Sequence, residues 1–293
     1  MAGFFAWFTK LTDRGLDVDE LARRLKIDVS QLTSTSLEYR SFHIPKRSGG
    51  GRTIDAPNDA LKHVQRLILK RILNGLKVHE CALGFERDRS IVSHAKRHCG
   101  KAVVIRLDVK DFFHNTRSDR VYAYFRFIGW NRNASKLLTA LTTFKGQLPQ
   151  GAPPSPRLSN LINYRMDVRL RAMVRSVSGE GGTYSRYADD ITFSVTQDHA
   201  DKVRAIIKGA STVVRDEGYF LHRKKKMHIL PSKYRQTVTG LVVNETVNLP
   251  RAKRRWLRAV EHHMQSGKPA SITAAQLAGW RGLVNMIHTQ RNA

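Results

Sequence analysis

Between residues 102 and 230, the spacing of apolar positions switches between the two-residue period of strands and the 3.6-residue period of helices. The predicted elements are, in chain order, a strand at 103–107, a helix at 121–128, a helix from Ser155 that carries apolar positions up to Leu170, strands at 184–187 and 191–195, a helix at 203–210 and a strand at 227–230. This order reduces to β-α-β-β-α-β, the split βαβ or ferredoxin-like arrangement. The pattern therefore predicts an α+β fold, which by itself assigns no activity.

The segment before this domain has a different pattern. Residues 13–38 are mildly acidic, and three leucines at helical spacing predict two short helices that cap the body. Two short extended arms, 42–46 and 52–57, flank a glycine-rich turn and predict a β-hairpin. A helix is expected from Asn58, with apolar residues on one face.

The chain after Pro250 is strongly basic, with eight Lys and Arg residues against the single acid Glu261. Trp256, Val260 and Met264 share one face of a predicted helix. Thr273 and Gln276 have the spacing of a capping box, which would begin a second helix. We expect a small helical domain with one apolar face and one cationic face.

Composition narrows the class of protein. The 293 residues carry a net charge of +27, and 41% of them are hydrophobic, enough to form a folded core. A folded protein this basic usually binds a polyanion such as a nucleic acid. Cys81 and Cys99 form no metal-binding or disulfide pattern, and no apolar run has the length of a membrane span or a signal peptide. We therefore expect a cytoplasmic protein with a nucleic-acid partner and no membrane.

Acidic residues occur at two predicted strand ends of this basic chain. Asp108 ends the first strand, and Asp189 and Asp190 form the turn between the two paired strands. Such a pair is often only a solvated turn, but the split βαβ topology makes these strands neighbours, so the three acids would converge. Converging carboxylates on a phosphate-binding surface are suited to hold two Mg²⁺ ions for nucleotidyl transfer. Asp111 is a fourth acid nearby, either involved directly or a satisfied strand-end carboxylate.

Three segments, in this order and spacing, resemble the palm motifs of reverse transcriptases. They are Leu107-Asp108-Val109-Lys110-Asp111-Phe112-Phe113, Leu148-Pro149-Gln150-Gly151-Ala152-Pro153-Pro154-Ser155-Pro156 and Tyr187-Ala188-Asp189-Asp190. The resemblance implies a right-hand polymerase with fingers, a split βαβ palm and a helical thumb. The implied domains are an N-terminal helical cap at 1–41, fingers at 42–101, a palm at 102–235 that includes part of the fingers at 114–150, and a primer-grip segment with the thumb at 236–293.

Two further segments are similar to signatures of the retron reverse transcriptases. His94-Ala95-Lys96-Arg97-His98 resembles their Asn-Ala-x-x-His, with His94 in place of Asn, and Val238-Thr239-Gly240 resembles their Val-Thr-Gly. His98 is accordingly expected to contact nucleic acid, the alternative being a packed or capping histidine.

The resemblance also assigns roles to single residues. Asp108, Asp189 and Asp190 match the catalytic triad, with Asp108 and Asp189 as the main metal ligands. Phe113 would lie under the sugar of the incoming nucleotide and exclude a 2′-hydroxyl. The other expected nucleotide contacts are Lys46, Arg52, Asp111, Gln150, Gly151 and Lys225, where Lys224 or Lys226 could replace Lys225.

The expected function is RNA-directed DNA synthesis. The enzyme would use dNTPs to copy part of a cognate noncoding RNA from the 2′-hydroxyl of a guanosine, giving a branched RNA–DNA hybrid used in phage defence with an effector protein. Phosphates of the RNA and DNA would be bound by Arg251, Lys253, Arg254, Arg255 and Arg258. The alternatives are a catalytically silent RNA-binding scaffold and a reverse transcriptase of another bacterial lineage. A group II intron protein and an RNA-dependent RNA polymerase fit less well, the latter because of Phe113.

Overall fold

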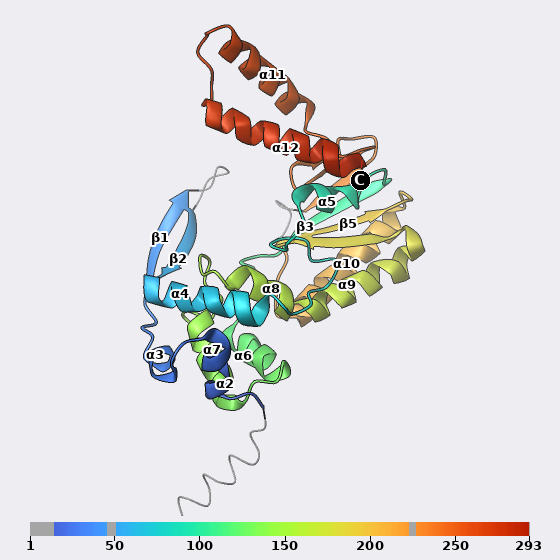
Figure 1. Ribbon diagram of the computed structural model, residues 1–293. Helices are drawn as coiled ribbons and strands as arrows, with labels where there is room; N and C mark the ends of the chain where they lie inside the picture. Colours follow the sequence, from blue (N-terminus) through green and yellow to red (C-terminus); the bar gives the residue numbers. More distant parts are fainter. Residues whose placement is uncertain (1–14, 46–50, 223–226, 293) are drawn as a thin grey trace, which may run out of the picture. The chain divides into compact units, whose positions relative to one another are not determined.

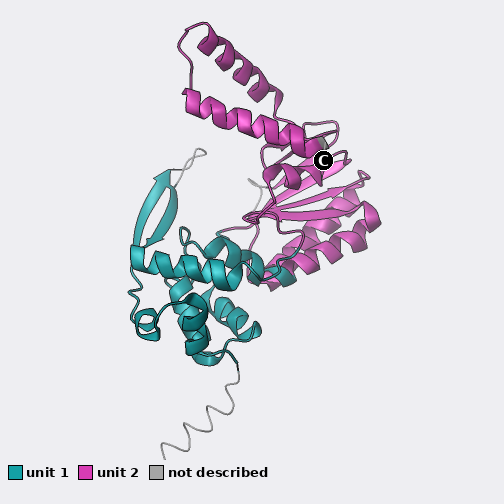
Figure 2. Ribbon diagram, viewed as in Figure 1, with its two compact units in different colours: residues 1–79, 111–165 teal, residues 80–110, 166–293 magenta. Residues whose placement is uncertain are grey.

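The computed structural model describes residues 15–45, 51–222 and 227–292. The chain forms two compact units (Figure 2): unit 1 comprises residues 1–79 and 111–165, and unit 2 comprises residues 80–110 and 166–293. Each unit is thus assembled from two separate stretches of the chain. The four-part division into cap, fingers, palm and thumb stays a prediction.

The β-hairpin of unit 1 has the predicted position. Strand β1 (Tyr39–Pro45) pairs antiparallel with β2 (Gly51–Pro57), with Tyr39 opposite Pro57 at one end and Pro45 opposite Gly51 at the other. Lys46 lies outside the described residues.

Helices form the rest of unit 1. They are α2 (Val18–Leu25), α3 (Val29–Thr33), α4 (Asp59–Ile68), the π-helical turn η1 (Leu69–Leu73), α6 (Ser118–Phe127), α7 (Arg132–Thr142) and α8 (Ser155–Ile162). The Asn58 side chain caps α4 by accepting a hydrogen bond of 2.8 Å from the amide of Leu61. Leu21, Leu25 and Leu32 of the predicted cap are fully buried in the same core as α4 and α7.

The helix expected to continue from Ser155 through Leu170 is interrupted. Helix α8 ends at Ile162, and α9 (Tyr164–Ser178) begins two residues later. Asn163, at the break, is buried; its side chain donates to the carbonyl of Ser159 at 2.8 Å and accepts from Arg120 at 3.1 Å. The expectation of one continuous helix is therefore wrong, because this asparagine ends α8 with side-chain hydrogen bonds that periodicity does not reveal.

Unit 2 contains the predicted split βαβ sheet (Figure 1). Its strands are β3 (Val103–Asp108), β4 (Thr183–Tyr187), β5 (Asp190–Val195) and β6 (His228–Pro231), in the antiparallel order β4-β5-β3-β6. Helices α9 and α10 (Ala200–Asp216) cover one face of the sheet, and the short α5 (Ile91–Lys96) lies on the other. The 3-10 turn η2 (Gly179–Gly181) precedes β4.

The C-terminal helices join unit 2 through a second apolar cluster. This cluster combines residues of α5, the small hairpin β7 (Thr237–Val238) and β8 (Leu241–Val242), α11 (Arg251–Gln265) and α12 (Ala274–Asn292). The predicted capping box is confirmed: Thr273 and Gln276 exchange hydrogen bonds of 3.0 and 3.2 Å between side chain and amide. Among the described residues, no helix combines the length and apolar character needed to span a bilayer.

His98 is part of the interior of unit 2. Its side chain is fully buried, with Nδ1 2.7 Å from the hydroxyl of Ser194 on β5 and Nε2 2.6 Å from that of Ser185 on β4. The expectation that His98 contacts nucleic acid is wrong for this side chain, because both ring nitrogens are engaged inside the protein. The alternative of a packed histidine is confirmed.

The buried histidines predict a dependence of stability on pH. Burial, with Arg97 and Arg106 nearby, lowers the pKa of His94 to about 3; burial, with His94, Arg97 and Lys101, lowers the pKa of His98 well below 6.5. At acidic pH these histidines therefore bind protons in the unfolded chain but not in the folded chain. Their contribution to the free energy of unfolding is fully present above about pH 6.5 and is lost as the pH falls toward 3. Each histidine contributes a slope of up to about 1.4 kcal/mol per pH unit.

Urea unfolding between pH 7 and pH 4 measures this slope. His94→Phe should reduce the slope by up to about 1.4 kcal/mol per pH unit, the contribution of one proton. The control is His262→Phe, which replaces an exposed histidine of α11 in the same unit and should leave the slope unchanged. An equal slope in wild type and His94→Phe would show that His94 binds its proton equally well in the folded and unfolded chain, which would contradict a lowered pKa.

Candidate active site and nucleic-acid groove

The acidic turn joins the central hairpin of unit 2. Tyr187, the last residue of β4, pairs with Asp190, the first residue of β5, so the turn consists of Ala188 and Asp189 alone. Ala188 has a φ of 57°, in the left-handed region that tight two-residue hairpin turns require. A β-carbon makes this conformation costly, so surrounding contacts must hold it.

The strand register brings Asp108 to the same turn. Asp108 on β3 is directly opposite Asp190 on β5, and the amide of Val109 donates to the carbonyl of Asp189 at 2.9 Å. Side chains of directly opposed residues point to the same face of a sheet. The carboxyl groups of Asp108 and Asp190 therefore share one face, and Asp189 lies at the adjacent tip.

Basic side chains lie beside two of these acids. Arg106 Nη2 lies 3.7 Å from Asp190 Oδ1, and His222 Nε2 lies 3.4 Å from Asp108 Oδ1. The amide of His222 also donates to the carbonyl of Asp108 at 2.8 Å. Adjacent carboxylates repel, so the guanidinium of Arg106 beside Asp190 reduces the cost of holding them together.

The carboxyl groups are not arranged as a complete set of metal ligands. In the part of the chain that the structure describes, no group of three His, Cys, Asp or Glu side chains is placed to hold a metal ion. The donors available here are carboxylate and carbonyl oxygens, the type that Mg²⁺ prefers, and Mg²⁺ commonly takes only one or two carboxylates beside water and phosphate. The chemistry of the donor set fits, and the three-carboxylate metal site stays a prediction.

A buried ion pair supports the turn from below. Arg186 and Asp167 are both fully buried and joined by two hydrogen bonds of 2.8 and 2.7 Å, and Arg186 Nη1 also donates to the carbonyl of Ala188 at 3.1 Å. Burial raises the pKa of Tyr184 well above its usual value, so its hydroxyl stays protonated and donates to Asp167 at 2.6 Å. The strained residue of the turn is thus held by a charged group that cannot move to solvent without breaking a buried pair.

The chain at 81–84 packs against the same hairpin. The amide of Leu83 donates to the carbonyl of Arg186, and the amide of Arg186 to the carbonyl of Cys81, both at 2.8 Å. A β-carbon on Gly84 would come within 2.7 Å of the amide nitrogen of Ala188. Glycine is required there because the backbone passes so close to the turn.

Unit 1 brings together three of the residues expected to bind a nucleotide. The carbonyl of Gln150 accepts a hydrogen bond of 2.9 Å from the backbone amide of Asp55 on β2. The same strand carries the exposed Arg52. Gly151 has a φ of 138°, and a β-carbon there would lie 2.8 Å from the carbonyl of Asp55. The loop of Gln150 and Gly151 is therefore fixed to the hairpin.

The remaining nucleotide candidates are less constrained. Phe113 is half-buried, and its ring packs edge-on against Phe112 with centroids 5.6 Å apart. Asp111 is exposed, has a φ of 46° and accepts from the amide of Asn115 through its carbonyl. Lys225 lies outside the described residues, as does Lys46. The nucleotide-binding roles of all these residues stay predictions.

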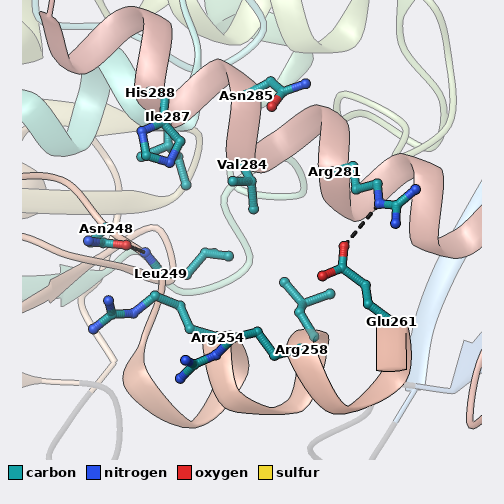
Figure 3. Close-up of a pocket in the computed structure, with 11 residues that line it drawn as sticks. Asn248, Leu249, Arg254, Arg258, Glu261, Arg281, Val284, Asn285, Ile287 and His288 are labelled. Atoms are coloured by element: carbon teal, nitrogen blue, oxygen red, sulfur yellow. Dashed lines mark hydrogen bonds and ion pairs between the residues drawn. The ribbon is translucent and has the colours of Figure 1, made fainter. Parts of the chain in front are cut away.

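A groove of about 550 Å³ lies between α11 and α12 (Figure 3), within the size range of ligand pockets. Arg254 and Arg258, one helical turn apart, line its α11 side, and Val284 and Ile287 of α12 face them. An ion pair of 2.9 Å between Arg281 and Glu261 bridges the two helices beside it. Its remaining lining residues are Asn248, Leu249, Leu257, Asn285 and His288.

The other basic residues of α11 point elsewhere. Lys253 is half-buried, with its ammonium 3.9 Å from the ring centre of Trp256 and 4.5 Å from that of Trp280. This cation–π contact fixes Lys253 between the two helices. Arg251 and Arg255 are exposed on α11 and are absent from the groove lining.

The sequence reasoning missed the partners of the acids. Arg106 precedes Asp108 by two residues, so the two-residue period of a strand already places both on one face. His222 is expected from no pattern, because its contact depends on the chain returning beside β3 after α10. The Arg186–Asp167 pair joins β4 to α9, and neither residue has a local pattern that indicates its partner.

Comparison with known proteins identifies the family. Residues 44–254 match the family described as reverse transcriptase (RNA-dependent DNA polymerase). The chain is 35% identical to the Retron Mx162 reverse transcriptase of Myxococcus xanthus, over 92% of this chain and 63% of that protein. It is 32% identical to the Retron Ec86 reverse transcriptase of Escherichia coli, over 90% of this chain and 81% of that protein. It therefore spans somewhat less than two thirds of the first relative and about four fifths of the second.

Solved structures agree on the fold. Telomerase from Candida albicans, in complex with a fragment of telomeric RNA, matches with a TM-score of 0.52 and 11% identity, over 79% of this chain and 48% of that one. Apo telomerase from Candida tropicalis, truncated from the C-terminal domain, matches with a TM-score of 0.50 and 15% identity, over 72% and 55%. The right-hand polymerase fold expected from the motifs is confirmed, and the chain belongs to the reverse transcriptases and, among them, to the retron reverse transcriptases.

Proposed function

We propose that this protein is an RNA-directed DNA polymerase that copies part of a cognate structured RNA into DNA. The observation that supports this most directly is the register that sets Asp108 opposite Asp190 and bonds Val109 to the turn residue Asp189. Three acids from two separate segments lie at one end of a sheet in a chain of net charge +27. A structural role does not require such an arrangement, whereas nucleotidyl transfer does.

Two Mg²⁺ ions are the proposed cofactor, with Asp108 and Asp189 as the main ligands and Asp190 beside them. Bound there, the metal would lower the pKa of the attacking hydroxyl and stabilise the charge of the leaving pyrophosphate. Arg106 reduces the repulsion between the carboxylates, and His222 lies 3.4 Å from Asp108. Tyr187 and the Arg186–Asp167 pair keep the turn in place.

Deoxynucleoside triphosphates are the proposed small substrates. We assign the stacking and steric selection of the sugar to Phe113, and contacts with the base and template to Gln150 and Gly151. Contacts with the phosphates are assigned to Arg52, Lys46 and Lys225, and a further nucleotide contact to Asp111. The fixed loop at Gln150 and Gly151 supports this assignment, since a rigid backbone allows the close approach that base selection needs.

The RNA partner is proposed to lie along α11. Arg254 and Arg258 would bind phosphates inside the groove, and Arg251 and Arg255 would bind them on the exposed surface of the helix. Asn285 and His288 offer hydrogen-bonding groups to an unpaired base, consistent with the way that proteins read single-stranded parts of structured RNA.

The finer biology follows from the retron relationship. We propose priming from a 2′-hydroxyl of the RNA, a branched RNA–DNA product and a role in antiphage defence with an effector protein. A catalytically silent RNA-binding scaffold is the second candidate. One observation favours it: among the described residues, no three acidic, histidine or cysteine side chains are placed to hold a metal ion.

Replacing Asp189 by Asn separates the two candidates. The variant should lose primer extension on an RNA template by about 10³-fold or more, because a metal ligand contributes several kcal/mol to the transition state. RNA binding, measured by fluorescence anisotropy, should be unchanged. Asp198→Asn removes the same charge from an exposed position of unit 2 and is the matched control. Failure of the wild type to extend its cognate RNA in Mg²⁺ would favour the scaffold.

The groove assignment predicts a change in the salt dependence of RNA binding. The double variant Arg254→Ala, Arg258→Ala should bind RNA more weakly and reduce the slope of log K against log [salt] by about 1.5, since each lost phosphate contact removes roughly 0.7–0.9. The control, Lys202→Ala with Lys208→Ala on α10, removes the same charge from the same unit. An equal loss in both double variants would show that only net charge matters and that the groove does not contact RNA.

A further inference from the structure

The short helix α5 is anchored at both of its ends. At its start, the Ser90 hydroxyl accepts from the amides of Val92 and Ser93, both at 3.1 Å, and donates to the side chain of Gln290 on α12 at 2.6 Å. Thr239 of the Val-Thr-Gly segment donates to the carbonyl of Ile91 at 3.2 Å. At its end, Lys96 donates to the carbonyl of Gln290 at 3.2 Å. This helix is therefore a fixed platform against the sheet (Figure 1).

Two histidines extend from this platform to the catalytic hairpin. His98 bonds Ser185 of β4 through one ring nitrogen and Ser194 of β5 through the other, at 2.6 and 2.7 Å. One buried side chain thus ties together the two strands that carry the acidic turn. Since both bonds lie in a dry interior, they hold the strands more firmly than the same bonds in water.

His94 contacts Tyr187, the last residue of β4 before the turn. Its ring lies 5.6 Å from the ring of Tyr187 at an interplanar angle of 31°, and 5.7 Å from the ring of His98. The side chain is fully buried, and within the described part of the chain neither of its ring nitrogens has a hydrogen-bond partner. His94 therefore contacts Tyr187 through the surface of its ring and not through a hydrogen bond.

The strand register places these contacts on the side of the acids. Ser194 is opposite Val104 and Asp190 is opposite Asp108, so alternate residues of β5 and β3 face α5. Tyr187 is opposite Asp190 and belongs to the same face. The histidines therefore support the face of the sheet that carries two of the three acids.

We propose that His94 and His98 are positioning residues for nucleotidyl transfer: they hold Tyr187 and the β4–β5 hairpin so that Asp189 and Asp190 stay aligned with Asp108. The inference rests on the proposed polymerase function. It assigns the His-Ala-Lys-Arg-His segment a role in packing inside the protein and not in contact with a substrate. His94, at the position where the related signature has Asn, acts through the surface of its ring. A displacement of about 1 Å at a reacting centre can reduce the rate by ~10²-fold, so support at this distance from the chemistry matters.

The test compares His94→Phe with His94→Ala in the full chain. Phenylalanine keeps a ring against Tyr187 and removes the unpartnered nitrogens, whereas alanine removes the ring. With Mg²⁺, poly(rA) primed by oligo(dT), and dTTP, we expect kcat to fall about tenfold or more in His94→Ala, with KM for dTTP and the affinity for the primed template unchanged. His94→Phe should keep kcat within about twofold of the wild type. Ser194→Ala, which removes one of the two His98 bonds, should lower kcat in the same way as His94→Ala.

Val203→Ala controls for general destabilisation, because it opens a cavity on α10, on the other face of the sheet. The ratio of the loss in kcat to the fall in melting temperature is compared between the two variants. An equal ratio in Val203→Ala and His94→Ala would overturn the proposal, because destabilisation alone would then explain the loss in kcat. Equal losses in His94→Phe and His94→Ala would also overturn it, as would a change in KM alone.

A readout without catalysis keeps this inference separate from the polymerase function. Hydrogen exchange of the Val109 amide, which bonds the carbonyl of Asp189, should be about tenfold faster in His94→Ala and unchanged in His94→Phe. Unchanged exchange in His94→Ala would show that His94 does not hold the turn. If the wild type failed to polymerise while exchange behaved as expected, the proposed function would fail and the positioning contact would stand.

Discussion

The antiparallel pairing of β3 with β5 is the constraint on which the rest of unit 2 depends. A slip of one residue in this register would send every side chain of one strand to the opposite face of the sheet, and Asp108 would no longer oppose Asp190. The apolar residues of β3 that alternate with Asp108 would then lose their burial. The hydrophobic core and the acidic site are therefore specified by the same pairing, and neither can shift without the other.

The site also depends on how its charges are balanced. A chain of net charge +27 has an excess of positive groups, so a cluster of acids has to be placed without being neutralised by the chain itself. Arg106 lies 3.7 Å from Asp190, close enough to reduce repulsion but longer than a good hydrogen bond. By contrast, Arg186 is held tightly by Asp167 below the turn, so its charge is already matched.

Much of this architecture follows from local pattern. The strands, the hairpin at 39–57, the acidic turn and the capping box of Thr273 could be predicted, because each depends on spacing within one segment. What could not be predicted depends on contacts between distant segments. Asn163 interrupts a helix through side-chain bonds, and His98 turns inward because two serines on different strands receive its nitrogens. Both polar residues look equally suited to the surface from sequence alone.

The burial of His98 also changes how a shared sequence signature is interpreted. A polar residue that recurs near a catalytic motif suggests contact with substrate, yet its position here is explained by what it joins inside the protein. A histidine with both nitrogens bonded to strands β4 and β5 cannot be replaced by an apolar residue without leaving two buried hydroxyls unpaired. His94 has no such bonds, so an aromatic ring should suffice there. Two histidines of one segment thus meet different physical requirements: one supplies hydrogen bonds, the other supplies shape.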